Sequence, residues 1–184
     1  MYKLGFFKDD EEREYHCSDL YTVERNSRYE RMVLGLSADH IAAIIELTAT
    51  LRGPFNALYV LHTPRTGNEP GRYQSKALSY DETVRLLKRF KSFFECDSRH
   101  DLWLHSPATN TTMVYDRHNL IYLYRPTNEQ LGIIERKGFD RKPWNTPVPH
   151  VHHYHAACDL FEAELINEKE YEWAKSPLRD EDLQ

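Results

Sequence analysis

The pattern of apolar and polar positions predicts a chain that alternates between short strands and amphipathic helices. Apolar runs rich in β-branched and aromatic residues predict strands at 31–36, 56–61, 102–105, 111–115 and 120–124, with 150–155 as a further candidate. Four polar residues, Asp116–Asn119, separate two of these runs, which is typical of a β-hairpin. The sheet is therefore expected to be at least partly antiparallel.

Two of the predicted helices begin with a capping box, in which Ser or Thr is followed three residues later by Glu or Gln. These motifs start at Ser79 and at Thr127. The helix after Ser79 is strongly amphipathic. Its apolar side carries Tyr80, Val84, Leu87, Phe90 and Phe94, and its opposite side carries Arg85, Lys88 and Arg89.

Two more helices are predicted from spacing alone. One follows the possible N-cap Ser37 and stops before Gly53-Pro54. The other spans 156–173 near the acidic end, where we expect Leu160, Phe161 and Leu165 to face the core.

These elements predict an α+β protein with a mixed, partly antiparallel sheet of about five strands packed by about four helices. We expect residues 31–175 to form this single domain. A polar, irregular arm is expected at 1–30 and an acidic tail at 176–184. Residues 63–77 are polar and are expected to form a long loop.

Charge is concentrated at one end of the chain. The 184 residues carry a net charge of −5, with 24 Lys and Arg against 29 Asp and Glu. From Ala156 onward nine acids face three bases, a charge of −6 that leaves +1 for the other 155 residues. Because phosphate binding needs a cationic surface, we do not expect a nucleic-acid partner. The acidic end indicates either a basic protein partner or simply a solvated helix face.

Several absences favour a cytoplasmic protein that does not associate with membranes. No apolar segment follows Lys3 as in a secretory signal, and no apolar run reaches the ~18 residues of a membrane helix. Cys17, Cys96 and Cys158 are odd in number and far apart, which fits a reducing compartment. The pattern does not predict an oligomeric state.

Two histidines occupy matching positions at strand ends. His62 and His105 each stand two residues before a proline, and Tyr124 holds the same position in a third strand. If the two histidine strands lie side by side and parallel, His62 and His105 would meet and would act as general acid and base. The alternative is that both are ordinary strand-end residues with hydrogen-bonded rings.

A second group of histidines lies near the acidic end. His150, His152, His153 and His155 form two His-x-His pairs, and residues two apart share one face of a strand. This spacing suits two imidazole ligands to a transition metal such as zinc. A third ligand would come from His62, His105 or His118, and Asp159 would add a carboxylate. The alternative is that these histidines are ordinary strand or loop residues.

No phosphate-binding loop or nucleophile motif occurs in the chain. The sequence therefore favours a small binding or regulatory protein that binds another macromolecule, as an immunity or antitoxin-like protein does. The alternative is a histidine-dependent, possibly metal-assisted hydrolase acting on an anionic small molecule. In that case Arg65, Arg72 and Tyr124 would bind the ligand. Whether the protein is an enzyme is left open.

Overall fold

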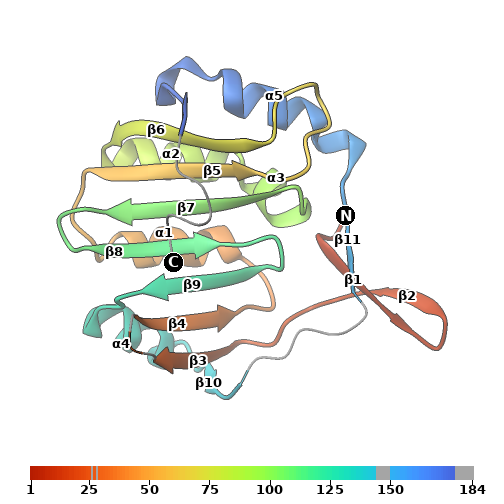
Figure 1. Ribbon diagram of the computed structural model, residues 1–184. Coiled ribbons are helices and arrows are strands. Elements are labelled where there is room, and N and C mark those ends of the chain that lie inside the picture. Colours follow the sequence, from red (N-terminus) through yellow and green to blue (C-terminus); the bar gives the residue numbers. More distant parts are fainter. Residues whose placement is uncertain (26, 28, 144–149, 177–184) are drawn as a thin grey trace.

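A nine-stranded sheet forms the body of the protein in the computed structural model, which describes residues 1–25, 27, 29–143 and 150–176 (Figure 1). All neighbouring strands are antiparallel except the pair at one edge, Asp140–Arg141 with Leu20–Arg25, which is parallel. The strands follow the spatial order β10 (Asp140–Arg141), β3 (Leu20–Arg25), β4 (Glu30–Gly35), β9 (Leu120–Tyr124), β8 (Thr111–Tyr115), β7 (His100–Ser106), β5 (Phe55–Leu61), β6 (Gly71–Leu78) and β12 (Ala174–Lys175).

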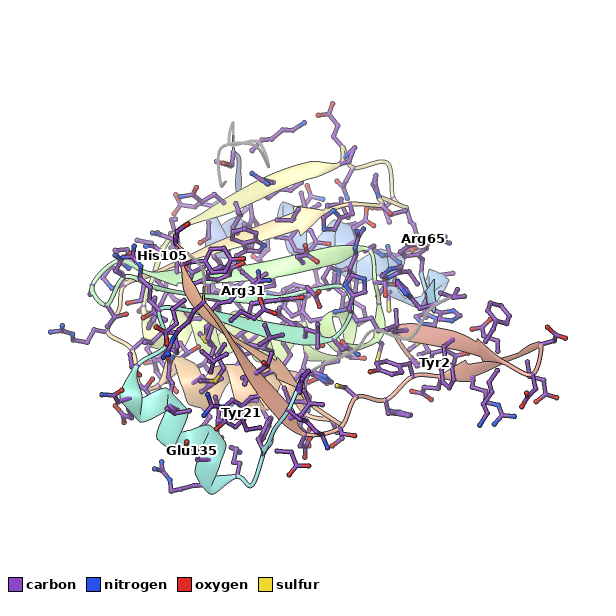
Figure 2. All side chains as sticks on the ribbon, turned by 60° about the horizontal axis from the view of Figure 1, so that its bottom comes forward. Tyr2, Tyr21, Arg31, Arg65, His105 and Glu135 are labelled. Atoms are coloured by element: carbon purple, nitrogen blue, oxygen red, sulfur yellow. The ribbon has the colours of Figure 1, made fainter. Side chains whose placement is uncertain are left out.

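A small three-stranded sheet stands beside the large one (Figure 1). Its strands are β11 (His150–His152), β1 (Leu4–Lys8) and β2 (Glu11–Glu14), all antiparallel. Tyr2, just before β1, lies at this sheet and far from Glu135 on the helix Asn128–Arg136 (Figure 2). Pairing of β1 with β11 brings the histidine-rich segment against the beginning of the chain.

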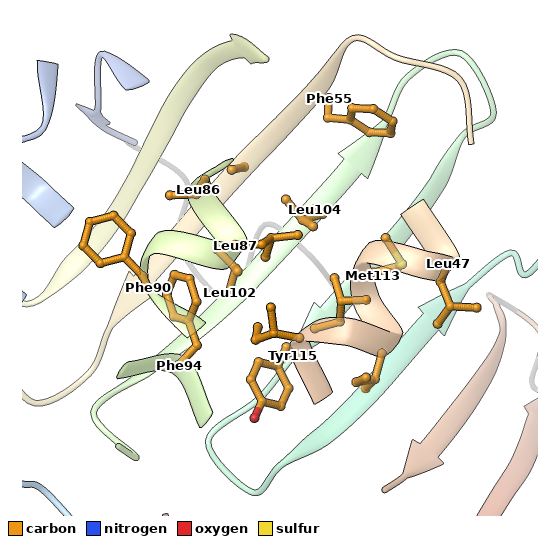
Figure 3. Close-up of a cluster of buried hydrophobic side chains, with 14 of the residues drawn as sticks. Leu47, Phe55, Leu86, Leu87, Phe90, Phe94, Leu102, Leu104, Met113 and Tyr115 are labelled. Carbon is orange, nitrogen blue, oxygen red and sulfur yellow. The ribbon is translucent and has the colours of Figure 1, made fainter. Parts of the chain in front are cut away.

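Five α-helices accompany the sheets among the described residues: α1 (His40–Thr48), α2 (Tyr80–Arg89), α3 (Lys91–Cys96), α4 (Asn128–Arg136) and α5 (Asp159–Asn167). Of these, α1 and α2 lie against one face of the large sheet (Figure 1). The core lies between these helices and the strands (Figure 3). There Leu87, Phe90 and Phe94 pack over buried strand residues such as Leu102 and Tyr115. Burial of these apolar side chains stabilises the fold.

The two capping boxes predicted from the sequence are confirmed. The Ser79 side chain accepts from the Glu82 amide while the Glu82 carboxylate accepts from Ser79, and Thr127 and Gln130 do the same at α4. The helix predicted to continue through Phe94 is interrupted: α2 ends at Arg89 and α3 begins at Lys91.

The fold is α+β, but the expectation of about five strands and four helices is wrong. One reason is β6, which occupies much of the polar stretch expected to be a loop. Its buried positions include Arg72 and Ser75, so apolar alternation does not mark it as a strand.

The first 30 residues also differ from the irregular arm that was expected, because β1, β2 and β3 lie there. The four residues of β2 are all exposed and charged, and therefore give no hydrophobic signal. Of the expected tail, residues 177–184 lie outside the described part of the chain.

The acidic end folds as several short pieces in place of the single helix expected over 156–173. A 3₁₀ turn at Ala156–Cys158 precedes α5, and a second one follows at Lys169–Tyr171. Leu165 is fully buried as expected, whereas Leu160 is 82% exposed. No helix among the described residues is long and apolar enough to cross a membrane.

Candidate metal centre

Three histidines from two distant parts of the chain meet beside the small sheet. His118 comes from the turn between β8 and β9, and His150 and His152 come from β11. One nitrogen from each ring lies within 4.8 Å of the other two. The ring centroids are 4.8 to 5.4 Å apart, and each pair of rings is edge-to-face. The three imidazoles are half-buried and form what we call the histidine triad.

Asp116 fixes the orientation of His118. One oxygen of its carboxylate accepts from the backbone amides of His118 and Leu120, both at 2.9 Å. The other oxygen lies 2.9 Å from His118 Nδ1. Because a carboxylate only accepts hydrogen bonds, Nδ1 donates to Asp116, and Nε2 is the ring nitrogen left to bind a metal. A carboxylate behind a histidine in this way is the usual outer partner of a metal ligand.

The turn that carries these residues is tight. The Asp116 amide donates to Leu120 O at 3.0 Å, and the Asn119 amide donates back to Asp116 O. Asn119 has a φ of 62°, a left-handed conformation that asparagine tolerates better than most residues. The four polar residues predicted to join two strands therefore hold a histidine in a defined position.

Strand β11 supplies the other two histidines because alternate residues share a face. Its pairing places His152 opposite Leu4 and His150 opposite Phe6. Lys3, just before β1, connects the small sheet to the β8–β9 turn. Its carbonyl accepts from the amide of His153, just after β11, and its Nζ donates to Asp116 O at 2.8 Å and to Phe94 O at 3.0 Å. Burial lowers the pKa of Lys3 to about 8.

The triad is suited to hold a divalent transition metal. Burial, followed by the neighbouring His118 and Arg117, lowers the pKa of His152 to about 4, so this ring is neutral at physiological pH. Neutral imidazole nitrogen is a preferred ligand of zinc. Three protein ligands leave at least one coordination position for water or substrate.

The other two histidines of the predicted cluster lie outside the triad. His153 Nε2 is 2.6 Å from a Glu12 carboxylate oxygen, and His155 Nε2 donates to Tyr2 O at 2.9 Å. Their rings stack on each other with centroids 6.0 Å apart. Of the four histidines predicted as ligands, the structure therefore groups only His150 and His152 with His118.

His62 and His105 are not brought together. Their strands are neighbours but antiparallel, with Asn56 opposite His105 and Leu61 opposite His100. The two histidines consequently lie at opposite ends, about 20 Å apart at ~3.3 Å per residue. His62 Nε2 donates to Asp101 at 2.8 Å, and His105 Nδ1 lies 3.0 Å from Thr112 Oγ1. The paired acid and base expected from parallel strands does not form.

The three residues predicted to bind an anion are not brought together, because Tyr124 lies at the opposite end of the sheet from Arg65 and Arg72. Arg65 lies at the opposite end of the sheet from His105, and its Nε donates to Asp159 at 3.1 Å (Figure 2). Tyr124 is at the His105 end, where its hydroxyl accepts from Arg31 at 2.8 Å. Arg72 is buried on β6.

A separate cavity of about 310 Å³ opens near the beginning of α1. Lys3, His40, Glu95 and Asn119 are among the residues that line it, and the three histidines of the triad are not. Burial lowers the pKa of His40 to about 4, and its ring stacks on Tyr115. The cavity and the triad therefore use different residues of the β8–β9 turn.

Sequence reasoning identified His118 only as one of three possible third ligands, and it missed Asp116. The signal was present in the Asp116-x-His118 spacing within a predicted turn. Comparison of the chain with family models, with curated proteins and with solved structures finds no match.

Proposed function

We propose that this protein is a zinc-dependent hydrolase whose metal is held by His118, His150 and His152. The observation that carries the proposal is the convergence of three imidazole nitrogens within 4.8 Å, one of them backed by a buried carboxylate. It favours the metal-assisted alternative of the sequence analysis over a purely binding function.

The chemistry follows from the ligand set. Three imidazole ligands would leave a zinc ion its full double charge, and this charge would lower the pKa of a water bound to it to about 7. Such a site would supply a hydroxide nucleophile at neutral pH. Imidazole also accommodates copper, nickel and iron, so zinc is proposed for its closed-shell Lewis acidity and common use in hydrolysis.

Binding of a basic protein partner stays a prediction, but the fold weakens the electrostatic argument for it, because acidic side chains near the acidic end already pair with arginines. Glu164 and Glu168 pair with Arg89 at 2.5 and 2.6 Å, and Glu170 pairs with Arg85 at 2.9 Å. The acidic end thus meets the basic face of α2. A cytoplasmic location likewise remains a proposal, supported by the three free cysteines.

The proposal is tested by metal analysis and by hydrolysis on the same samples. Chelator-treated protein is reloaded with zinc and assayed with p-nitrophenyl acetate and p-nitrophenyl phosphate. We expect one zinc per chain, zinc-dependent hydrolysis of at least one ester, and loss of both properties in His118→Ala and His152→Ala. His105→Ala is the matched control, because His105 is also half-buried but lies far from the triad.

Two results would count against the proposal. Zinc binding that survives His118→Ala would place the metal elsewhere. Stoichiometric zinc at the triad without hydrolysis of either ester would leave a metal site and remove the hydrolase.

A further inference from the structure

Arg117 occupies the position between the triad residue His118 and the carboxylate that orients it. Its amide donates to Asp101 at 2.9 Å, and its carbonyl accepts from Ser98 Oγ at 3.2 Å. Both sides of its backbone are therefore held by other strands or loops. This anchoring fixes the root of the Arg117 side chain beside the triad.

The guanidinium of Arg117 has no partner among the residues that the structure describes. Arg117 is half-buried, and within that part of the chain its side chain forms no hydrogen bond or ion pair. Its Cα is joined by one trans peptide, ~3.8 Å, to the Cα of the triad residue His118. Placing an unpaired cation against a metal-ligating cluster is unfavourable unless an anion joins them.

Other arginines at the end of the large sheet where the β8–β9 turn lies already pair with carboxylates. Arg99 is fully buried among carboxylates, with Asp97 at 2.8 Å and Glu162 at 2.7 Å. Arg65 pairs with Asp159. Arg117 is thus better placed than Arg65 to bind an anionic group.

The carboxylates around Arg117 are engaged elsewhere. Asp116 uses both oxygens on His118 and the turn amides, and Asp101 pairs with His62 at 2.8 Å while accepting from the Arg117 amide. Each of these carboxylates contacts a histidine and not the Arg117 guanidinium. A divalent metal together with Arg117 would therefore attract a doubly charged anion to the site.

Building on the proposed zinc centre, we propose that the site takes the phosphate group of a phosphate monoester, with one oxygen on the metal and another bound by Arg117. The planar fork of a guanidinium donates two parallel hydrogen bonds to such a group, which lysine does not do. The sequence predicted that Arg65, Arg72 and Tyr124 bind the anion, and we assign that role to Arg117 in their place.

The test uses the full chain loaded with zinc and titrated calorimetrically with inorganic phosphate and, separately, with acetate. We expect phosphate to bind more tightly than acetate. We also expect phosphate affinity to fall about tenfold or more in Arg117→Gln, since a charge-assisted hydrogen bond contributes on that order. Arg117→Lys should recover only part of the loss. Arg136→Gln, which removes an exposed arginine on α4, is the control and should leave the affinity unchanged.

Zinc affinity is measured first on every variant, so that the two proposals fail separately. Wild-type protein that binds no zinc overturns both. If Arg117→Gln binds zinc like the wild type and binds phosphate equally well, the zinc centre stands and the role of Arg117 is refuted. Tighter binding of acetate than of phosphate refutes the phosphate class.

Discussion

Glu162 on α5 offers a sharp test of how the fold positions its loops. Its side chain is fully buried and accepts from Arg99 Nη1 at 2.7 Å and from Thr66 Oγ1 at 2.6 Å. The backbone amides of Arg65 and Thr66 donate to it at 3.1 and 3.2 Å. One carboxylate thus joins α5, the residue just before β7 and the loop that leaves β5.

The change Glu162→Gln keeps the shape and removes the charge. Removing one partner of a buried ion pair costs about 3–5 kcal/mol because the other charge stays buried. Arg99 retains Asp97 and Asp159, and the amide oxygen still accepts one hydrogen bond, so we expect a loss of about 2–3 kcal/mol. Glu164→Gln is the control: its pair with Arg89 is exposed and contributes less than about 1 kcal/mol.

Urea unfolding at neutral pH measures both variants against the wild type. Burial by itself would raise the pKa of Glu162, but hydrogen bonds from Thr66 and Arg99 outweigh it and hold this pKa below its ordinary value. The contribution of the carboxylate is therefore present above the unfolded pKa of ~4.5 and is lost as the pH falls through the folded value. The difference in the free energy of unfolding between Glu162→Gln and the wild type should therefore become smaller at acidic pH. If Glu162→Gln is no less stable than Glu164→Gln at pH 7, the reasoning is refuted.

Two further predictions concern the triad and its anchor. Asp116→Asn should weaken zinc binding about 10- to 100-fold in a metal titration, since an amide no longer fixes the His118 tautomer; unchanged affinity would mean that Asp116 does not orient the ligand. Burial lowers the pKa of Lys3 to about 8 from 10.5, so the unfolded chain binds more protons between these values and stability should rise from pH 8 to 9.5. Lys3→Met should flatten that rise in urea unfolding curves, and a slope equal to that of the wild type would show that Lys3 is not its source.

The helices with side-chain caps could be read from the sequence because their signals are local. Ser79 with Glu82 and Thr127 with Gln130 define two helix starts within four residues each. The hairpin through Asp116 to Asn119 is local in the same way. Such elements need no knowledge of the rest of the chain.

The missed strands depend on long-range pairing. In β6, Arg72 is buried beside strands that the sequence does not place next to it, and β2 consists of exposed charges paired to β1. Leu160 shows the opposite failure, because an apolar residue at helical spacing faces solvent. Burial in these cases is decided by tertiary contacts and not by residue type.

The triad was predictable in part for the same reason. Strand alternation correctly groups His150 with His152, since a period of two is a local property. The choice of His118 over His62 and His105 requires β11 to pair with β1 and Lys3 to reach the β8–β9 turn. No periodic signal encodes that arrangement.

X-ray absorption at the zinc edge of the zinc-loaded full chain tests the central claim most directly. We predict three imidazole nitrogens at about 2.0–2.1 Å together with one light-atom ligand, with the nitrogen count reduced in His118→Ala. Sulfur scattering near ~2.3 Å, or a shell of oxygens without imidazole, would contradict the three-histidine centre.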